Sequence, residues 1–237
     1  MAGINAHLFL SGKDPFVLRR DQAYIGVLID DLINKGVDEP YRMFTSRAEY
    51  RILLRQDNAD FRLTELSYGL GLASQERYDA VMRKQEAVEA LSSYCAVAKM
   101  KPDSVNDYLV SVDSTPLSES KHLSDLVARP EVSLGELLRV VPRGTKSRTF
   151  SPAVVTAVEI AIKYAGYIER EKLQAQKNER LEYIKIPSDF DFDFLQSLSI
   201  ECRQKLIRYK PETIAQASRI SGVSPADISV LLVYFGR

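Results

Sequence analysis

The sequence lacks tryptophan and has only two histidines and two cysteines among its 237 residues. Cys95 and Cys202 are too few for a disulfide framework, and with His7 and His122 they form no pair at zinc-binding spacing. We therefore expect neither a disulfide-stabilised fold nor a bound metal.

An excess of charge of one sign is also missing, because 32 Lys and Arg residues balance 32 Asp and Glu residues. Net charge therefore identifies no partner, and any contact with a nucleic acid must come from a local basic patch. The apolar runs are far shorter than the roughly 20 residues that cross a bilayer, and the N-terminus lacks the basic start of a signal peptide. These features predict a cytoplasmic protein without a membrane partner.

Catalytic motifs are absent as well. The sequence contains no GxGxxG dinucleotide fingerprint, no GxxxxGK[ST] phosphate loop and no GxSxG nucleophile motif. The acidic run at 189–194 alternates like a strand, but carboxylates alone are weak evidence for a metal. We predict no catalytic residue, and the chain alone does not have the features of a complete enzyme.

Helix signals dominate the rest of the chain. Residues 1–10 have the composition of the last turns of a buried helix without a cap, so we expect the chain to begin inside a larger domain. A helix is predicted over 21–35, and another after Pro152 that extends to about residue 183 unless Gly166 interrupts it. The residues expected to cap helices are Thr64, Ser74, Ser133, Ser151, Ser199, Thr213 and Ser224.

These signals predict a mainly α fold. A small mixed α/β part, residues 1–63, is followed by a helical-bundle domain, residues 64–237. Three prolines divide the end of the chain into short helices, and residues 199–237 are expected to form a terminal subdomain.

The segment 39–55 is unusually rich in arginine. Arg47, Arg51 and Arg55 are four residues apart, so they share one face of either a helix or a strand. A capping-box pattern at 46–49 favours a helix, whereas 50–54 also fits a strand, and the pattern does not decide between them.

This segment has the chemistry of a phosphate-binding surface. Arg42 adds a fourth guanidinium, and the aromatic residues between the arginines are of the kind that stack on bases. The alternative is that nearby acidic residues neutralise the arginines in ion pairs. The acidic candidates are Glu49, Asp57 and Asp60.

A second basic stretch contains Arg143, Lys146 and Arg148, with no acidic residue between Glu136 and Glu159. A basic loop with Gly and Pro can follow a phosphate backbone. The alternative is that the loop is only solvated.

The last two predicted helices, joined through Gly222, resemble a helix-turn-helix. Asp227 stands where a recognition helix would meet phosphate, which disfavours DNA binding. The rest of the final helix is apolar nearly all round, which predicts burial in its own bundle or against a partner. The residues expected to bind a partner are Ile228, Leu231 and Leu232.

Four stretches together resemble the glucose-inhibited division protein A family, the FAD-binding subunit of the tRNA uridine 5-carboxymethylaminomethyl modification enzyme. The longest runs Glu39-Pro-Tyr-Arg-Met-Phe-Thr-Ser-Arg-Ala-Glu-Tyr-Arg-Ile-Leu-Leu-Arg to Thr64. The others lie at 23–32, 162–169 and 216–222, and residues 1–6 resemble the helix that closes the FAD domain. The resemblance covers essentially the whole chain and corresponds to the C-terminal third of the family's protein.

The resemblance implies a parent protein that binds FAD in a Rossmann-like domain and is reduced by NADH. With a GTPase partner and methylene-tetrahydrofolate as carbon donor, this homodimer modifies the wobble uridine of certain tRNAs. The FAD fingerprint is not in this sequence. The resemblance further implies that the C-terminal helical domain holds tRNA and docks the GTPase.

For this chain, the resemblance implies contact with the tRNA backbone, or orientation of the flavin-side pocket, by Arg42, Arg47, Arg51 and Arg55. It implies GTPase docking by the final helix. The loop at 143–148 is more basic than the family pattern, so we treat it as a candidate tRNA contact particular to this chain. The alternative is an interaction module that docks the GTPase without touching RNA.

Overall fold

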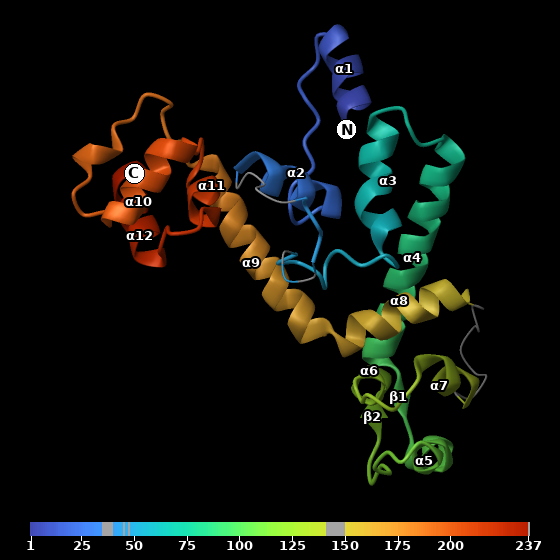
Figure 1. Cartoon of the computed structure of the whole chain (residues 1–237). Coiled ribbons are helices and arrows are strands. Elements are labelled where there is room, and N and C mark those ends of the chain that lie inside the picture. Colours follow the sequence, from blue (N-terminus) through green and yellow to red (C-terminus); the bar gives the residue numbers. More distant parts are fainter. Residues whose placement is uncertain (35–39, 45, 47, 141–149, 237) are drawn as a thin grey trace. The chain divides into compact units, whose positions relative to one another are not determined.

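The computed structural model describes residues 1–34, 40–44, 46, 48–140 and 150–236. These residues form two compact units (Figure 1). Unit 1 combines two separate stretches, Met1–Leu54 and Arg170–Arg237, whereas unit 2 is the continuous stretch Arg55–Glu169. The mainly helical fold class is confirmed.

Unit 2 is a set of helices with one short antiparallel strand pair, in which Lys99 pairs with His122 and Met100 with Lys121. Its long helix α4 begins after the predicted cap Ser74, whose side chain accepts a hydrogen bond from the amide of Arg77. Its elements are α3 (Ala59–Gly69), α4 (Gln75–Val97), β1 (Lys99–Met100), α5 (Pro102–Ser111), β2 (Lys121–His122), α6 (Leu123–Val127), α7 (Leu134–Val140) and α8 (Pro152–Lys163).

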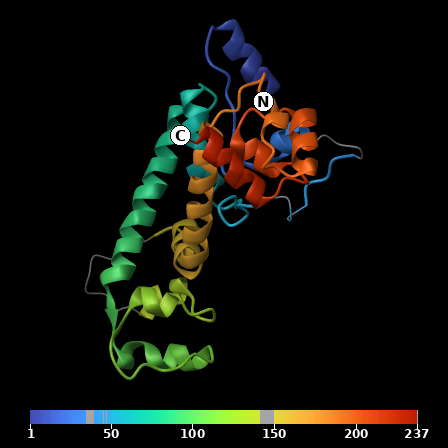
Figure 2. The same cartoon turned by 90° about the vertical axis from the view of Figure 1, so that its left-hand side faces the viewer.

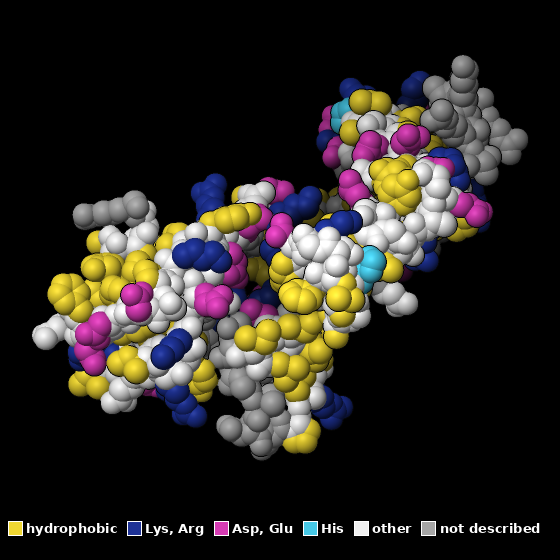
Figure 3. Space-filling view, turned by 90° about the horizontal axis from the view of Figure 1, so that it is seen from above, with side chains coloured by type: hydrophobic (Ala, Val, Ile, Leu, Met, Phe, Trp, Pro, Cys, Tyr) yellow, Lys and Arg dark blue, Asp and Glu magenta, His cyan; other side chains and the backbone are white. Residues whose placement is uncertain are grey.

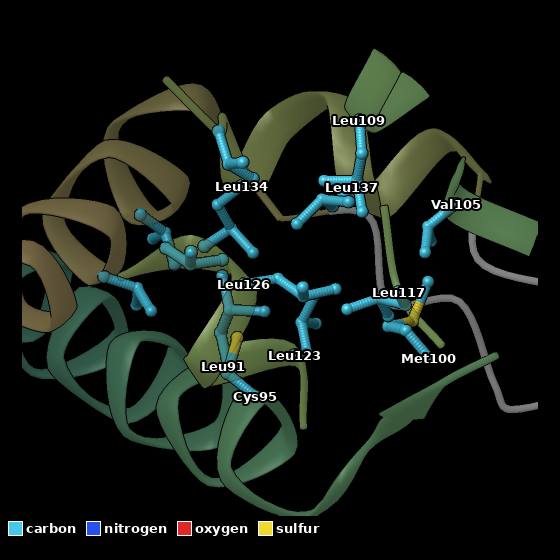
Figure 4. Close-up of a cluster of buried hydrophobic side chains, with 14 residues drawn as sticks. Leu91, Cys95, Met100, Val105, Leu109, Leu117, Leu123, Leu126, Leu134 and Leu137 are labelled. Atoms are coloured by element: carbon cyan, nitrogen blue, oxygen red, sulfur yellow. The ribbon is translucent and has the colours of Figure 1, made fainter. Parts of the chain in front are cut away.

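One apolar core holds the lower part of unit 2 together (Figure 4). Helix α4 contributes Leu91 and Cys95, and α5, α6 and α7 face them with fully buried leucines and valines. Helix α8 packs against α4, which it crosses in Figure 1, and closes this core with Val154 and Val158. Figure 2 shows α4 from another side, as the long teal-to-green helix. The core therefore arises almost entirely from contiguous sequence.

Unit 1 contains helices from both ends of the chain. Helix α9 starts within unit 2 and continues into unit 1. The elements are α1 (Ala2–Leu10), α2 (Tyr24–Asn34), α9 (Ala165–Tyr183), the 3-10 helix η2 (Phe192–Phe194), α10 (Ile200–Tyr209), α11 (Ile214–Arg219) and α12 (Pro225–Phe235).

The end of unit 1, residues 184–236, has an apolar core of its own, and we call this part the C-terminal subdomain. The predicted caps Ser199, Thr213 and Ser224 each accept a hydrogen bond from the amide three residues on. Asp227 joins two of these caps, because its carboxylate accepts hydrogen bonds from the amides of Ser199 and Ser224.

Several local predictions are corrected. Thr64 is buried in the middle of α3 and does not cap it, and the alternating run at 189–194 forms a turn and η2, not a strand. The long helix after Pro152 is interrupted, but at Tyr164, two residues before Gly166. The compact units divide the chain after Leu54 and after Glu169, and the domain boundary at residue 63 stays a prediction.

Helix α1 is present as predicted, but Leu8 is its only buried residue. Phe9 and Leu10 are exposed. Among the described residues, no helix combines the length and apolar character that a membrane span requires.

Candidate RNA-contact and docking surfaces

A network of charged side chains joins the two stretches of unit 1. The Arg20 guanidinium donates to Asp30, Asp31 and Glu49 at 2.7–2.8 Å. Arg219, in the distant second stretch, donates to Asp30 at 2.9 Å and to Glu182 at 2.8 Å. We call these six residues the arginine network; Asp30 is shared by its two arginines.

The core of the network is buried. The side chain of Arg20 is 8% exposed and that of Asp31 is 1% exposed. Burial by itself lowers the pKa of Arg20, but its hydrogen bonds to Glu49 and Asp31 outweigh this effect and raise the pKa above its ordinary value. The guanidinium therefore stays charged, and the network fixes the positions of α2, α9 and α11.

Close backbone packing places Arg20 in this network. A Cβ added to Gly26 in α2 would overlap the carbonyl groups of Leu18 and Arg19. Only glycine allows the chain before Arg20 to lie so close to α2.

A pocket of about 470 Å³ lies beside the network within unit 1. Its lining includes six carboxylates and four basic side chains. The glycine-rich turn that holds a dinucleotide diphosphate is absent from this lining, and the carboxylates would repel the diphosphate. The pocket therefore does not fit FAD, and among the described residues no cluster could hold a metal ion.

In its described part, the arginine-rich segment is irregular at 40–44 and forms turns at 49–53, so neither the α-helix nor the strand predicted for it is present there. Glu171 of α9 accepts hydrogen bonds from the amides of Ile52 and Leu53 at 3.0 and 3.1 Å. Asn178 of α9 donates to the hydroxyl of Tyr50. Helix α9 thus anchors this segment to the second stretch of unit 1.

The predicted RNA-binding arginines have different environments. Arg42 and Arg51 are exposed in unit 1, and the Arg42 guanidinium lies 5.4 Å from the ring centre of the exposed Phe44. Arg55 belongs to unit 2 and forms an ion pair with Asp57 at 3.0 Å. Arg51 and Arg55 therefore belong to different units, and Arg47, Arg143, Lys146 and Arg148 lie outside the described residues, so the shared face stays a prediction.

The acidic residues proposed as neutralising partners bind elsewhere in two of three cases. Asp57 does pair with Arg55, but Glu49 pairs with Arg20 and Asp60 pairs with Lys84 at 2.7 Å. Sequence reasoning missed Arg20 and Arg219, because their partners are 10 to 189 residues away. The only sequence signal for this network was the adjacent pair of carboxylates, Asp30 and Asp31, within a predicted helix.

The prediction for partner-binding residues on α12 is corrected at Leu231. Its side chain is fully buried in the core of the C-terminal subdomain and cannot contact another protein directly. Ile228 and Leu232 are partly buried against the same core. The exposed large side chains of α12 are instead Val233 and Tyr234.

Two family profiles match most of the chain. The tRNA modifying enzyme MnmG/GidA C-terminal helical domain matches residues 75–172, and the tRNA modifying enzyme MnmG/GidA C-terminal helical bundle matches residues 174–237. The second match covers the C-terminal subdomain and the second half of α9.

Curated relatives carry the same assignment. The tRNA uridine 5-carboxymethylaminomethyl modification enzymes MnmG of Parabacteroides distasonis and Bacteroides thetaiotaomicron are 54% and 52% identical to the chain over its whole length. The chain spans 39% of the length of each.

Solved structures of GidA are also similar to the chain. The structure of Aquifex aeolicus GidA in the form II crystal is 41% identical, with a TM-score of 0.77, and the match covers all of this chain and 36% of that one. The form I crystal structure gives a TM-score of 0.73 over 98% of this chain and 35% of that one.

Proposed function

Because the chain belongs to the MnmG/GidA family of tRNA-modifying enzymes, we propose that it provides the tRNA-binding and partner-docking part of such an enzyme. In this proposal the whole enzyme adds a (carboxymethyl)aminomethyl group to the wobble uridine of tRNA, together with a GTPase partner. The present chain supplies binding surfaces and no catalytic residue.

The observation that carries the RNA-binding role is the exposed pair Arg42 and Phe44, with Arg51 exposed on the same anchored segment. A guanidinium over an aromatic ring can pair with phosphate while the ring stacks on an unpaired base. Hydrogen bonds from the segment's backbone to Glu171 limit its motion, so less conformational entropy is lost on binding.

Acidic partners would weaken such a surface, but they are engaged elsewhere. Glu49 is the carboxylate nearest in sequence to Arg51, and its two oxygens accept hydrogen bonds from Arg20. This pairing leaves the positive charge of Arg51 available to phosphate.

The chemistry of the whole enzyme is proposed from the family alone. FAD would be held by a domain that this sequence does not include, with NADH as reductant and methylene-tetrahydrofolate as carbon donor. The protein would act in the cytoplasm as a homodimer. Since the pocket beside the arginine network does not fit FAD, we assign its residues no step of that reaction.

Titration of labelled tRNA with the chain, followed by fluorescence anisotropy, tests the RNA-binding role. We expect Arg42→Glu with Arg51→Glu to weaken binding at least tenfold, and log Kd to rise with log salt in proportion to the phosphates contacted. Arg77→Glu with Arg83→Glu is the matched control, because both are exposed on α4. Equal affinity of the two double variants would remove Arg42 and Arg51 from the role.

A second candidate function, docking of the GTPase without RNA contact, is favoured by the exposed aromatic side chains of the C-terminal subdomain. Co-purification of the GTPase with and without ribonuclease distinguishes the two. Loss of the GTPase on ribonuclease treatment supports a role that includes RNA. Unchanged co-purification, with no tRNA binding by the isolated chain, supports docking alone.

A further inference from the structure

The C-terminal subdomain has a second, smaller pocket of about 270 Å³, lined by residues 187–193 and the end of α10. Its lining is unusual in pairing aromatic rings with three carboxylates, those of Asp189, Asp191 and Asp193. Lys210 is the only basic residue among the described lining residues. The pocket is therefore both apolar and acidic.

The carboxylates of Asp189 and Asp193 form no ion pair within the described chain, whereas Asp191 caps a helix. Asp191 caps η2 by accepting a hydrogen bond from the amide of Asp193. Asp189 and Asp193 are exposed, and no Lys or Arg of the described chain pairs with either. The fold does not use these two charges, so they are available to a ligand.

An exposed aromatic surface continues from the pocket. Phe190 lines the pocket and also contacts Tyr234 of α12, with ring centres 5.3 Å apart. Phe194 contacts Tyr234 as well, and it is 70% exposed although the buried Phe192 is only two residues away. Figure 3 shows hydrophobic side chains and carboxylates interspersed over the C-terminal helices, at the left of the view.

The chemistry of this surface selects among ligands. RNA is disfavoured, because phosphates would meet Asp189 and Asp193. A metal is disfavoured, because no group of carboxylates among the described residues could hold one. The volume lies below the range of about 300–1,000 Å³ that is usual for small-molecule sites, so a protein side chain suits the pocket better.

We propose that Asp189, Phe190, Asp193, Phe194, Ile207 and Tyr234 form a docking surface for a basic, apolar segment of a protein partner. A Lys or Arg of that segment enters the pocket between Asp189 and Asp193 and lies against Phe190. Large apolar side chains next to it pack on Phe194 and Tyr234. Charge complementarity and cation–π contact define the segment.

This inference rests on the proposed docking role, and it moves the contact away from the buried Leu231. The partner of the proposed function is the GTPase subunit, so we expect its docking segment to contain a basic residue flanked by apolar ones.

Binding of the full chain to the purified GTPase subunit, measured by biolayer interferometry, tests the proposal. Phe194→Ala should weaken binding about tenfold or more, and Asp189→Asn with Asp193→Asn about threefold to tenfold. Asp189→Lys with Asp193→Lys should weaken binding further. Asp189→Asn with Asp193→Asn should reduce the dependence of binding on salt concentration. Because these side chains are exposed, the variants are expected to fold.

Matched controls in unit 2 are Leu72→Ala, which removes an exposed apolar side chain, and Asp103→Asn with Asp107→Asn. If the wild-type chain does not bind the GTPase, both the proposed docking role and this inference fail. If it binds and the surface variants bind as tightly as the controls, only this inference fails. The inference would also be overturned if tRNA competed with the GTPase for this surface and if Asp189→Asn with Asp193→Asn removed that competition.

Discussion

The two units of this chain are stabilised in different ways. Unit 2 packs fully buried leucines and valines from one continuous stretch around Leu91. Where unit 1 joins its two stretches, the apolar cluster of the described residues is small and consists of Val27, Tyr50, Leu54 and Ala175 with two partly buried neighbours. There the arginine network and the hydrogen bonds from α9 make the remaining contacts.

The difference shows that the chain uses apolar burial to shape unit 2 and the C-terminal subdomain, and charged side chains to position the two stretches of unit 1. Apolar packing tolerates repacking, whereas hydrogen-bonded ion pairs fix one arrangement and are costly when half removed. The precisely held segment is the one that presents Arg42 and Arg51. Each unit also contains one buried cysteine, Cys95 or Cys202, which can report its opening separately.

Arg20→Met should have the largest effect. It leaves Asp31 buried without its cation, and we expect a loss of about 3–5 kcal/mol in the stability of unit 1. Hydrogen exchange should rise in peptides covering 20–54 and 170–183, while peptides from α4 to α8 stay protected. Arg20→Lys, which keeps the charge, should recover part of the protection. Uniform exchange in both units would show that they do not unfold separately.

Leu126→Ala and Leu206→Ala form a matched pair, because each removes a fully buried leucine from one apolar core. Each should cost about 2–5 kcal/mol through lost burial and the cavity left behind. The first should speed thiol labelling of Cys95 and the second that of Cys202. The reverse pattern would contradict the assignment of these cores to separate units.

Asp227→Asn should cost roughly 1–3 kcal/mol, because it weakens charge-assisted hydrogen bonds to the Ser199 and Ser224 caps. These bonds outweigh the effect of burial and lower the pKa of Asp227 below its ordinary 3.8. The carboxylate therefore contributes its stability above pH 3.8, and the contribution fades as the pH falls toward the lower folded pKa. Between pH 2 and 7, the melting temperature of the variant should fall less at acid pH than that of the wild type. Parallel curves would show that other groups cause the loss of stability in acid.

Gly222→Ala should cost about 1–2 kcal/mol, because the residue has φ +96° and a Cβ would overlap the carboxylate of Glu201. Adding Glu201→Ala removes the overlap and leaves the backbone strain. If the double variant regains full stability in urea unfolding, overlap and not strain is the cause.

The smallest effect concerns the unmodified protein. Burial raises the pKa of the Cys95 thiol to about 11, and burial with the charge of Asp227 raises that of Cys202 to about 12. At pH 8 both thiols should label very slowly with a thiol reagent and react fully in guanidinium chloride. Rapid labelling of either cysteine would show that its core opens often.

Local signals in the sequence predicted much of the fold. Ser74, Ser151, Ser199, Thr213 and Ser224 were recognisable as caps because the hydrogen bond that each accepts comes from only three residues away. Thr64 has the same residue chemistry but lies inside α3, where tertiary packing buries it. Capping chemistry therefore marks possible starts, and packing decides among them.

The candidate sites were less predictable. The spacing of Arg51 and Arg55 implied a shared face only if the backbone were regular, and contacts with α9 hold it in turns instead. The apolar sequence of α12 did not show that the side chain of Leu231 is buried whereas that of Tyr234 is exposed. Phe194 is exposed at the end of a 3-10 helix, in a run whose alternation predicts a strand.

The interrupted sequence of unit 1 has a consequence for biosynthesis. A ribosome adds about 5–20 residues per second, so the 115 residues from Arg55 to Glu169 separate the synthesis of the two stretches of unit 1 by roughly 6–23 s. During that interval the nascent chain can complete unit 2, while Asp30 still awaits Arg219 and the amides of Ile52 and Leu53 still await Glu171 of α9. The charged junction is therefore expected to be the last region of this chain to mature, and the one where a chaperone has the longest time to act.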